Sequence, residues 1–600
     1  MNNPLLTLQL AADELLAAAL VNAGQKITLP CNGRGSCGKC RAIVDGALCP
    51  PNDIELQHLS PDELAAGVRL ACQARASGGE VRFYSLPKVS DFGILVEGYD
   101  TSGAIDSNLT VTRLTLSPAT HNSVSEWKRV TAADDANNLP SDPPPLFLLQ
   151  NLPDVFAAAA GQVEVAAFAQ RLVSIRPAKS RKPFYGIAYD IGTTTMVAYL
   201  VNLNNGKVVT VLPRSNPQAA HGADVMSRIN HASQSAGLQQ LHDELVAAMD
   251  DMAATLALQT GIAFTDIVTF STVGNTCMHH LLLGISPTPL GQTPYLPVYT
   301  EELFTWGRDL GFSRFAHCLV WTGPVVGGFV GADAVAAGVA GKLLSDEQPR
   351  LLIDLGTNGE ILLSAHGRIL ACSAAAGPAF EGVQISCGMR AQEGAIDGLV
   401  LDEDGVKLHV LGENVAPAGI CGSGLIDAVA EMLRVGVIDE TGRFNSPAEV
   451  AASTGPAVAS RLVEQDGNWA FRLTTGEQAL TLTQADIREV QLAKGAIRAA
   501  IEICCDEMKI SSDEITQVLL AGAFGNYIRK DNAVRLGLLP AIPLRRINSI
   551  GNAAGAGAVL ALASQQARAA SVSLAAQAEH VDLGGHPAFQ EKFVDAMLFL

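Results

Sequence analysis

A seven-residue motif suited to binding phosphate occurs twice in this chain, at residues 189–195 and again 164 positions later at residues 353–359. In each copy an aspartate, Asp190 or Asp354, is followed two residues later by a glycine and then by hydroxyl or amide side chains. Glycine lets the backbone approach a ligand closely, and the groups that follow can donate hydrogen bonds to phosphate oxygens. A carboxylate at the end of a strand can hold Mg²⁺, usually through water.

These properties predict a phosphate site with divided roles. Asp190 and Asp354 are the candidate catalytic residues, which would position Mg²⁺. The predicted phosphate contacts are Gly192, Thr193, Thr194, Thr195, Gly356, Thr357 and Asn358.

Short apolar runs on both sides of each motif predict the elements that position it. Residues 186–189 and 351–353 precede the two copies, and residues 196–201 and 361–363 follow them. A turn signal and a third apolar run come next in both cases, so each copy is predicted to form strand, tight turn, strand, hairpin turn and strand. One copy alone could be an ordinary hairpin. Two copies in matching contexts favour a pair of phosphate-binding hairpins.

A second correspondence further along the chain supports a duplicated domain. A predicted helix at 238–260 and a strand at 266–272 precede a glycine-containing turn. A predicted helix at 483–507 and a strand at 518–520 precede another such turn. With its two hairpins, this part of the chain resembles the actin/sugar-kinase/Hsp70 superfamily of ATPases, whose fold is ribonuclease H-like. The resemblance implies that both hairpins face one ATP·Mg²⁺ cleft.

Roles for three other glycine-rich segments are predicted either from the same resemblance or from weaker sequence patterns. In the superfamily the turn after the last of these strands lies against adenosine, which implies that role for Gly522, Ala523 and Gly525. Residues 419–424 lead into a predicted helix, where Gly422, Ser423 and Gly424 could cradle a phosphate or simply form a helix-start turn. The segment 327–333 is predicted to pack small residues.

Four cysteines near the N-terminus have the spacing of iron–sulfur ligands. Three lie in a glycine-rich loop with C-x5-C-x2-C spacing, and the fourth follows 32 positions later. Such a loop can point backbone N–H groups at the sulfurs of a [2Fe–2S] cluster. The pattern resembles plant-type ferredoxins, with a first gap one residue longer, whereas structural zinc would use two C-x2-C pairs. The predicted cluster ligands are Cys31, Cys37, Cys40 and Cys72.

Composition excludes some classes of partner and location. The net charge of −19 argues against nucleic acid and anionic membranes as partners. No apolar stretch has the length and flanks of a signal peptide or a membrane span, so we expect a cytoplasmic protein. Twelve cysteines in such a protein are expected to be metal ligands and buried thiols, not disulfides.

An ATPase fused to a ferredoxin-type domain resembles the reductive activators of corrinoid proteins, which include the methylamine methyltransferase activators. The resemblance rests on the cysteine loop with Cys72, both aspartate motifs, residues 274–280 and residues 521–526. It implies ATP-dependent transfer of one electron from a [2Fe–2S] cluster to corrinoid Co(II), which regenerates the Co(I) used in methyl transfer. The implied cofactors are the cluster, ATP and Mg²⁺, and the implied partners are a corrinoid protein of a methyltransferase system and a cellular electron donor.

The coupling to ATP has a physical reason. A ferredoxin-type cluster has a potential near roughly −400 mV, and the Co(II)/Co(I) couple lies below it. Each ~59 mV uphill costs a factor of ten for one electron, so electron transfer alone would leave almost no Co(I). ATP binding or hydrolysis can change which state of the complex is favoured.

The predicted organisation is an α/β multidomain chain. Its parts are a β-grasp ferredoxin-like domain at 1–88, a linker with a small middle domain at 89–182, the ATPase at 183–570, and a tail at 571–600. The ATPase halves are predicted at about 183–345 and 346–570. In the middle part, residues 109–116 and 163–175 alternate as strands do. No motif distinguishes a monomer from a homodimer.

Three other functions fit parts of the pattern. A small-molecule kinase with a regulatory iron–sulfur domain would need a catalytic carboxylate that the sequence alone does not identify. An electron carrier or binding module with a structural ATPase fold would bind no nucleotide. An activator of a radical dehydratase would carry a different cysteine pattern. The ferredoxin loop joined to the repeated aspartate motif favours the corrinoid activator.

Overall fold

The computed structural model describes residues 4–23, 25, 40–85, 106–121, 123–134, 138–180, 182–222, 224–345, 348–382, 384–412, 415–465, 467–476, 479–525 and 527–599. The chain divides into two compact units. Unit 1 comprises Met1–Ile94, Asp346–Asn552 and Val581–Leu600. Unit 2 comprises Leu95–Ser345 and Ala553–His580. The chain therefore passes from unit 1 to unit 2 and back twice. The predicted domain boundaries are not tested by this division and stay predictions.

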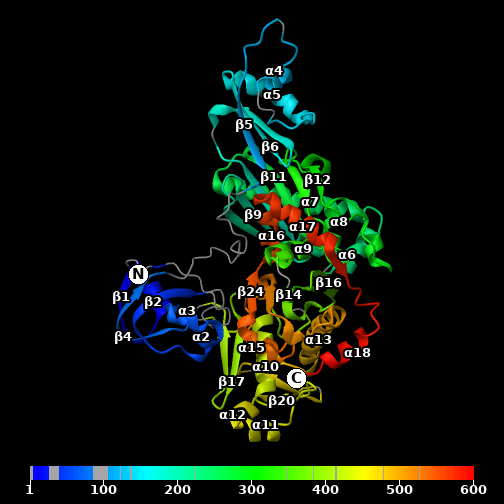
Figure 1. Ribbon diagram of the computed structural model, residues 1–600. Helices are drawn as coiled ribbons and strands as arrows, with labels where there is room; N and C mark the ends of the chain where they lie inside the picture. The colour runs from blue at the N-terminus through cyan, green and yellow to red at the C-terminus, as the bar shows by residue number, and fades with distance from the viewer. Residues whose placement is uncertain are drawn as a thin grey trace. The chain divides into compact units, whose positions relative to one another are not determined.

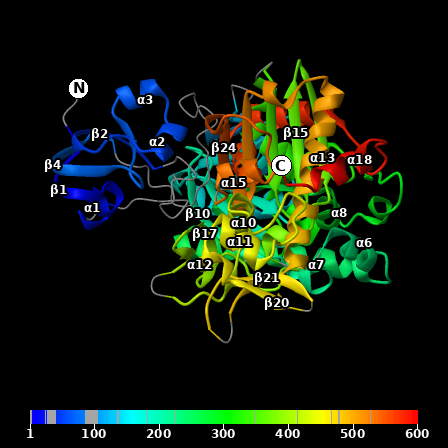
Figure 2. The same cartoon turned by 90° about the horizontal axis from the view of Figure 1, so that it is seen from below.

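The N-terminal part of unit 1 is a four-stranded antiparallel sheet in the order β1-β4-β2-β3 (Figure 2). Alternate residues of β2 are buried, as expected for a sheet with one covered face. Buried Arg69 and Glu55 form a bidentate ion pair, with Nη2–Oε2 at 2.7 Å, and Glu55 also completes the capping box of α2. The elements are β1 (Leu6–Leu15), α1 (Leu16–Asn22), β2 (Arg41–Leu48), α2 (Asp53–His58), α3 (Pro61–Ala65), β3 (Val68–Leu70) and β4 (Arg75–Phe83).

The sequence predicts a strand at residues 5–10 and a helix at residues 13–22, but β1 continues to Leu15 because it stays paired with β4 as far as Arg75 across a bulge. It also predicts a strand at residues 26–29, which lie outside the described residues.

Unit 2 begins with a small three-stranded antiparallel sheet in the order β5-β6-β7. The alternating segment 163–175 is two strands joined at Ala169 and Gln170, both with positive φ. Apolar residues of α5 pack against this sheet, and that helix was not predicted. The elements are β5 (Leu109–Thr115), α4 (Glu126–Ala132), α5 (Leu146–Ala159), β6 (Gln162–Phe168) and β7 (Arg171–Pro177).

The remainder of unit 2 is built on a mixed sheet in the order β10-β9-β8-β11-β13-β12 (Figure 1). Strands β8, β11 and β13 run parallel, and β8, β9 and β10 form an antiparallel meander. The elements are β8 (Tyr185–Ile191), β9 (Thr195–Asn202), β10 (Val208–Ser215), α6 (Val225–Ala232), α7 (Gly237–Thr260), β11 (Ile267–Gly274), α8 (Thr276–Leu282), β12 (Leu303–Trp306), β13 (Leu319–Thr322), α9 (Ala332–Ala340), α16 (Ala553–Ala563), α17 (Gln565–Gln577) and β25 (Ala578–His580).

Unit 1 contains a second sheet whose strands follow the order β24-β23-β14-β15-β16. Here β14, β23 and β24 run parallel, and β14, β15 and β16 form the meander. Its elements are β14 (Arg350–Leu355), β15 (Gly359–Ala365), β16 (Arg368–Ala374), α13 (Gln484–Met508), β23 (Gln517–Ala521), α14 (Gly522–Gly525), α15 (Lys530–Arg535), β24 (Ile547–Gly551) and α18 (Phe589–Ala596). Each unit therefore repeats the same five-strand order, and the predicted duplicated ribonuclease H-like body is confirmed.

A segment between β16 and α13 enlarges the second half, and the sequence predicted only its helix after residues 419–424. It forms two small sheets, β18-β17-β19 and β20-β21-β22, together with three helices. The elements are β17 (Ala395–Asp402), β18 (Gly405–Val410), β19 (Gly419–Ile420), α10 (Gly422–Arg434), α11 (Pro447–Ser453), α12 (Pro456–Ala459), β20 (Leu462–Gln465), β21 (Asn468–Arg472) and β22 (Thr481–Leu482).

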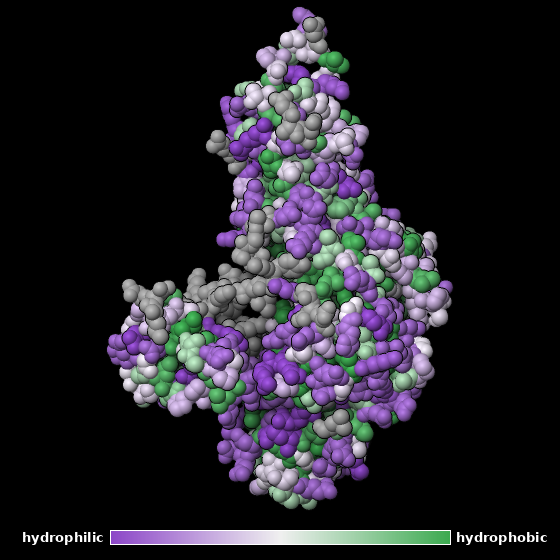
Figure 3. Space-filling model, in the orientation of Figure 1, coloured by the Kyte–Doolittle hydropathy of each residue, from purple (hydrophilic) through white to green (hydrophobic). Residues whose placement is uncertain are grey.

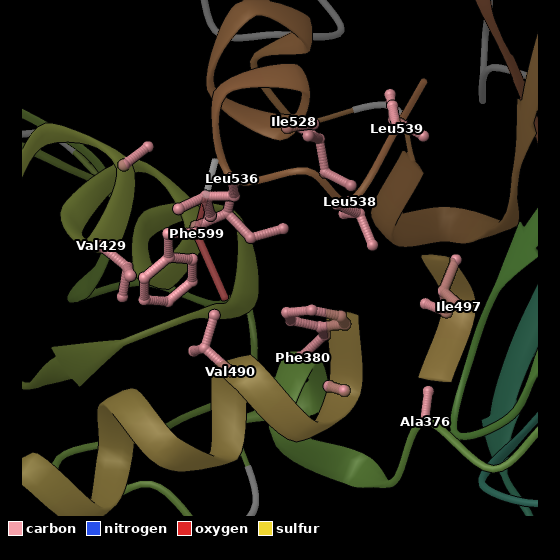
Figure 4. Packing of buried hydrophobic residues seen from close by; sticks show 14 of the residues in the cluster. Ala376, Phe380, Val429, Val490, Ile497, Ile528, Leu536, Leu538, Leu539 and Phe599 are labelled. Carbon is pink, nitrogen blue, oxygen red and sulfur yellow. The ribbon is translucent and has the colours of Figure 1, made fainter. Parts of the chain in front are cut away.

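Each unit has its own apolar core. In unit 1, Figure 4 shows Phe599 near Val429 of α10 and Val490 of α13, so the end of the chain contributes to this core. In unit 2, α16 is buried over almost its whole length and packs closely on α9. A Cβ on Gly557 would lie 2.2 Å from the carbonyl oxygen of Ala336, so the small residues of α16 permit that close packing.

Hydrophilic and hydrophobic residues are mixed over the face seen in Figure 3. Among the described residues, no helix combines the length and apolarity that a membrane crossing requires.

Candidate functional site

The first aspartate motif forms a tight turn between β8 and β9 in unit 2. Asp190 lies at the carboxyl end of β8, opposite Val273 of the parallel strand β11. The Gly192 N–H donates to the Thr195 carbonyl at 3.0 Å, and a Cβ on Gly192 would lie 2.6 Å from that oxygen. The turn therefore requires glycine at this position, as the motif predicts.

The neighbouring strand β11 ends beside this turn and fixes one of its hydroxyl groups. Asn275, which follows β11 and caps α8, donates from Nδ2 to Thr193 Oγ1 at 2.9 Å. Thr193 and Thr194 are partly buried, and Thr195 is exposed. Because Thr193 Oγ1 accepts this bond, its own proton remains free to be donated to a ligand.

A carboxylate that sequence reasoning missed lies near Asp190. Asp333 stands in the first turn of α9, and the Ala334 N–H donates to its Oδ1 at 2.8 Å. Burial, and then the negative charge of Asp190, raise the pKa of Asp333 to about 7. A carboxyl group with such a pKa can accept a proton near neutral pH, which is what a general base requires.

The glycine-rich segment that contains Asp333 was visible in the sequence, but its glycines predict packing and not a catalytic carboxylate. Its segment, residues 327–333, was predicted to pack small residues, and Gly331 does pack closely on Asn275. A Cβ on Gly331 would lie 2.4 Å from the Asn275 Cα. The same close packing brings the start of α9 to the end of β11, next to the Asp190 turn.

The second aspartate motif forms the corresponding turn between β14 and β15 in unit 1. The Gly356 N–H donates to the Asn358 carbonyl at 3.1 Å, and Asp354 lies opposite Ala521 of β23. Thr357 Oγ1 donates a hydrogen bond to the carboxylate of Glu381. Gly356 is exposed, and Thr357 and Asn358 are partly buried.

The predicted adenosine turn adjoins this second motif. Gly522 has φ +86°, and a Cβ there would lie 2.8 Å from Asp354 Oδ1. The Gly525 carbonyl accepts a hydrogen bond from Ser549 Oγ at 2.9 Å. The structure thus brings Gly522 to the Asp354 motif, whereas the side chain of Ala523 lies outside the described part. Contact with adenosine stays a prediction.

The glycines at the start of α10 have a packing explanation. Gly422, Ser423 and Gly424 are buried, and a Cβ on Gly424 would lie 2.2 Å from the Ile396 carbonyl oxygen. This contact favours the helix-start interpretation, and phosphate binding there stays an untested prediction.

Two of the four predicted cluster ligands are described. Cys40 and Cys72 are buried, and the Cys72 N–H donates to Cys40 Sγ at 3.4 Å. Gln73 Nε2 lies 3.6 Å from Cys72 Sγ. Amide groups directed at cysteine sulfurs favour thiolates, so this pair fits a cluster-binding role. Cys31 and Cys37 lie outside the described residues.

Other histidines and cysteines of the described chain form no candidate metal group. His280 is held by the Thr276 carbonyl and by the Val298 N–H, at 2.8 and 2.9 Å. Burial lowers the pKa of neighbouring His279 to about 4, so its ring stays neutral. Cys504 is buried 3.6 Å from Cys372, as expected for core thiols.

Known protein families match the chain in three consecutive segments. Residues 4–77 match the 2Fe-2S iron-sulfur cluster binding domain, residues 185–346 match the RACo middle region, and residues 348–600 match the C-terminal ASKHA domain of RACo. The middle-region match contains the Asp190 turn, and the C-terminal match contains the Asp354 turn.

Similar proteins extend the match over the full length. The chain is 30% identical over 605 residues to the corrinoid activation enzyme RamQ of Eubacterium limosum, covering 99% of this chain and 97% of the relative. It is 27% identical over 402 residues to the [Co(II) methylated amine-specific corrinoid protein] reductase of Methanosarcina barkeri, covering 61% and 68%. The solved structure of a reductive activator for corrinoid,iron-sulfur protein has a TM-score of 0.73 and 28% identity, and the match covers 99% and 96%.

Proposed function

Because this chain belongs to the RACo family, whose members reductively activate corrinoid proteins from Co(II) to Co(I), we propose that ATP and Mg²⁺ bind at its two aspartate turns and drive that reduction. The observation that carries the proposal is the presence of a ferredoxin-type domain and two matching aspartate turns in one chain. A one-electron donor explains the reduction, and a nucleotide site explains how an unfavourable reduction can proceed.

The ferredoxin domain supplies the electron in this proposal. A bound [2Fe–2S] cluster accepts and releases one electron at low potential. Cys31, Cys37, Cys40 and Cys72 would hold it, and the Cys72 N–H and the Gln73 amide would stabilise the negative charge on the sulfurs.

Each of the two aspartate turns would contribute its own groups to nucleotide binding. Thr193, Thr194 and Thr195 would donate to phosphate oxygens, and Thr357 and Asn358 would complete the phosphate contacts. Asp190 and Asp354 would position Mg²⁺ or the attacking water. We add Asp333 to this set as the group that accepts the proton of that water, because its raised pKa suits proton transfer near neutral pH.

The partners we propose are a corrinoid protein of a methyltransferase system and a cellular electron donor. The two curated relatives are named for acting on corrinoid proteins, one of them on a protein specific for methylated amines.

A direct test follows the Co(I) absorbance band. The purified protein, with its cluster reduced under anaerobic conditions, is mixed with a Co(II) corrinoid protein of the same genome, with and without ATP·Mg²⁺. We expect Co(I) only with ATP. If no Co(I) forms with any available corrinoid partner while the cluster reduces and ATP is hydrolysed, the proposal fails, and a screen for phosphorylated products becomes the next step.

A cysteine variant separates the two parts of the chain. Cys37→Ala should bleach the visible absorbance of the cluster and leave ATP hydrolysis and thermal unfolding of the ATPase body unchanged. Buried Cys318, whose Sγ bonds the Ile267 carbonyl at 3.1 Å in unit 2, provides a matched control as Cys318→Ala, which should keep the full cluster spectrum. Full absorbance in the Cys37 variant would remove that residue from the ligand set.

A further inference from the structure

Arg228, on helix α6 of unit 2, lies beneath the Asp190 turn and is completely buried. Its Nη2 donates to the Thr193 carbonyl, and its Nε donates to the Gly222 carbonyl at 3.0 Å. Its Nη1 lies 3.2 Å from Gln218 Oε1 and 3.3 Å from Met278 Sδ. The guanidinium is therefore fixed by four groups from three segments: the Asp190 turn, the connection between β10 and α6, and α8.

All of these partners are electrically neutral. Among the described residues, Arg228 forms no ion pair with a carboxylate, and nearby Asp224 instead caps α6 through Ser227. Burial lowers the pKa of Arg228 to about 10, which leaves it protonated at neutral pH. A buried charge without a counterion is unfavourable, and natural proteins usually pair one. Arg228 is therefore a buried positive charge to which no described carboxylate is bonded, and the Asp224 carboxylate acts on it only through space.

The turn above Arg228 shows where an anion would lie. The Gly192 carbonyl accepts from Asn216 Nδ2 at 2.9 Å, and the Thr194 carbonyl accepts from the Asn216 N–H at 2.9 Å. The Thr193 carbonyl between them accepts from Arg228. Asn216 Nδ2 also lies 3.7 Å from Met278 Sδ, the sulfur that Arg228 contacts, so all three carbonyls are held from the same side.

Because the peptide bond is planar and trans, the direction of each carbonyl fixes the direction of the N–H group that follows it. In each peptide the carbonyl and the following N–H point in opposite directions. When the carbonyls of Gly192 and Thr193 point toward Asn216 and Arg228, the N–H groups of Thr193 and Thr194 point away from them. Successive N–H groups on one side of a turn form a nest that binds anions.

We propose that Arg228 is a positioning residue for the terminal phosphates of the nucleotide: it fixes the Thr193 carbonyl so that the turn presents its amides outward, and its buried charge is neutralised when the phosphates bind on the other side. This inference rests on the proposed nucleotide site at the Asp190 turn. It predicts that the site discriminates by phosphate charge, because the benefit of a buried positive charge grows with the negative charge of the ligand.

The test compares ligands that differ only in phosphate number. Binding of ATP, ADP and AMP, each with Mg²⁺, is measured by calorimetry for the full-length wild type, Arg228→Met and Arg228→Lys. A charge-assisted contact is worth about 10- to 100-fold in affinity. We therefore expect Arg228→Met to weaken ATP by about 30-fold, ADP less, and AMP by less than about twofold. Arg228→Lys keeps the charge and should lose about fivefold for ATP.

Arg568 offers a matched control in the same unit. It is buried, burial lowers its pKa to about 10, and it bonds to the carbonyls of Ala561 and Ser107. It lies over the Phe168 ring, with its Cζ 4.8 Å from the ring centroid, and these hydrogen-bond acceptors lie outside the Asp190 turn. Arg568→Met should change the affinities for all three nucleotides equally, within about twofold.

The possible outcomes distinguish a failure of the role proposed for Arg228 from a failure of the proposed nucleotide site. Equal losses of ATP and AMP affinity in Arg228→Met, or no loss of ATP affinity, would show that Arg228 is structural and overturn the inference. If Arg228→Met does not fold, the same comparison of ATP with AMP in Arg228→Lys decides. A wild-type chain that binds no ATP would instead overturn the proposed nucleotide site itself.

Discussion

The two aspartate turns share a sequence motif and a strand order, but different chemical groups form hydrogen bonds to them. The Asp190 turn is held by Asn216, Asn275 and the buried cation Arg228. The Asp354 turn is held through the Thr357 hydroxyl, which donates to the carboxylate of Glu381. Duplication therefore preserved the backbone of the turn and left the surrounding charge to diverge.

The hydroxyl groups show the same divergence. Thr193 Oγ1 accepts a hydrogen bond from Asn275 and keeps its proton for a ligand, whereas Thr357 commits its proton to Glu381 and keeps only lone pairs. A free donor backed by a cation suits phosphate oxygens. A free acceptor beside carboxylates suits a hydrated Mg²⁺. We infer that the first turn chiefly binds phosphate and that the second chiefly supports the metal.

The largest effect is expected from the two aspartates. Asp190→Asn and Asp354→Asn should each lower the rate of ATP hydrolysis by at least about 100-fold, because each removes a charge that orients Mg²⁺ or water. The cluster spectrum should not change. Steady-state hydrolysis and visible absorbance measure both properties in one preparation. Normal hydrolysis in both variants would show that the turns are not the nucleotide site.

Asp333 adds a pH dependence that belongs to the first turn alone. Its folded-state pKa of about 7 lies above the ordinary value of 3.8, so the folded state holds a proton that the unfolded state releases. Stability from this group is therefore present at low pH and is lost as pH rises toward about 7, by on the order of a few kcal/mol. Hydrolysis should change in the opposite direction, because only ionised Asp333 can accept a proton.

Asp333→Asn removes both trends. Thermal unfolding measured from about pH 5 to pH 8 should become flatter than in the wild type, and hydrolysis should fall by about 100-fold and no longer rise through neutral pH. A variant that keeps the wild-type pH profile for hydrolysis would exclude Asp333 as the base.

How much of this comparison the sequence could predict depends on the distance between the residues involved. The turns were identified because aspartate, glycine and threonine stand within six positions of one another and the flanking apolar runs define the strands. The family, the fold class and the reductive activation of a corrinoid protein followed from those turns and the cysteine spacing, and the full-length matches confirm them.

The residues behind the turns could not be predicted in the same way. Asp333 stands 143 positions from Asp190 along the chain and approaches the Asp190 turn only because α9 packs on the end of β11. Its segment, residues 327–333, predicts no more than the packing of small residues. Arg228 has a role only because its acceptors are all neutral, which is a property of three-dimensional packing. Helix α5 and the sheets between β16 and α13 were also missed, since short apolar runs do not by themselves distinguish strand from helix.

The smallest expected effect is the most specific test of the difference between the turns. Thr193→Val removes the proton that we assign to phosphate, so ATP affinity should fall by about tenfold while the Mg²⁺ concentration for half-maximal hydrolysis stays the same. Thr357→Val leaves the Glu381 carboxylate without its hydroxyl partner, so the Mg²⁺ requirement should shift by about threefold while ATP affinity at saturating Mg²⁺ changes little.

Both substitutions remove one hydroxyl of the same kind from equivalent positions, which makes each the control for the other. Titrating ATP at fixed Mg²⁺, and Mg²⁺ at fixed ATP, measures the two responses separately. If both variants lose ATP affinity equally and neither changes the Mg²⁺ response, the turns act alike, and the divergence in the groups behind them has no functional consequence.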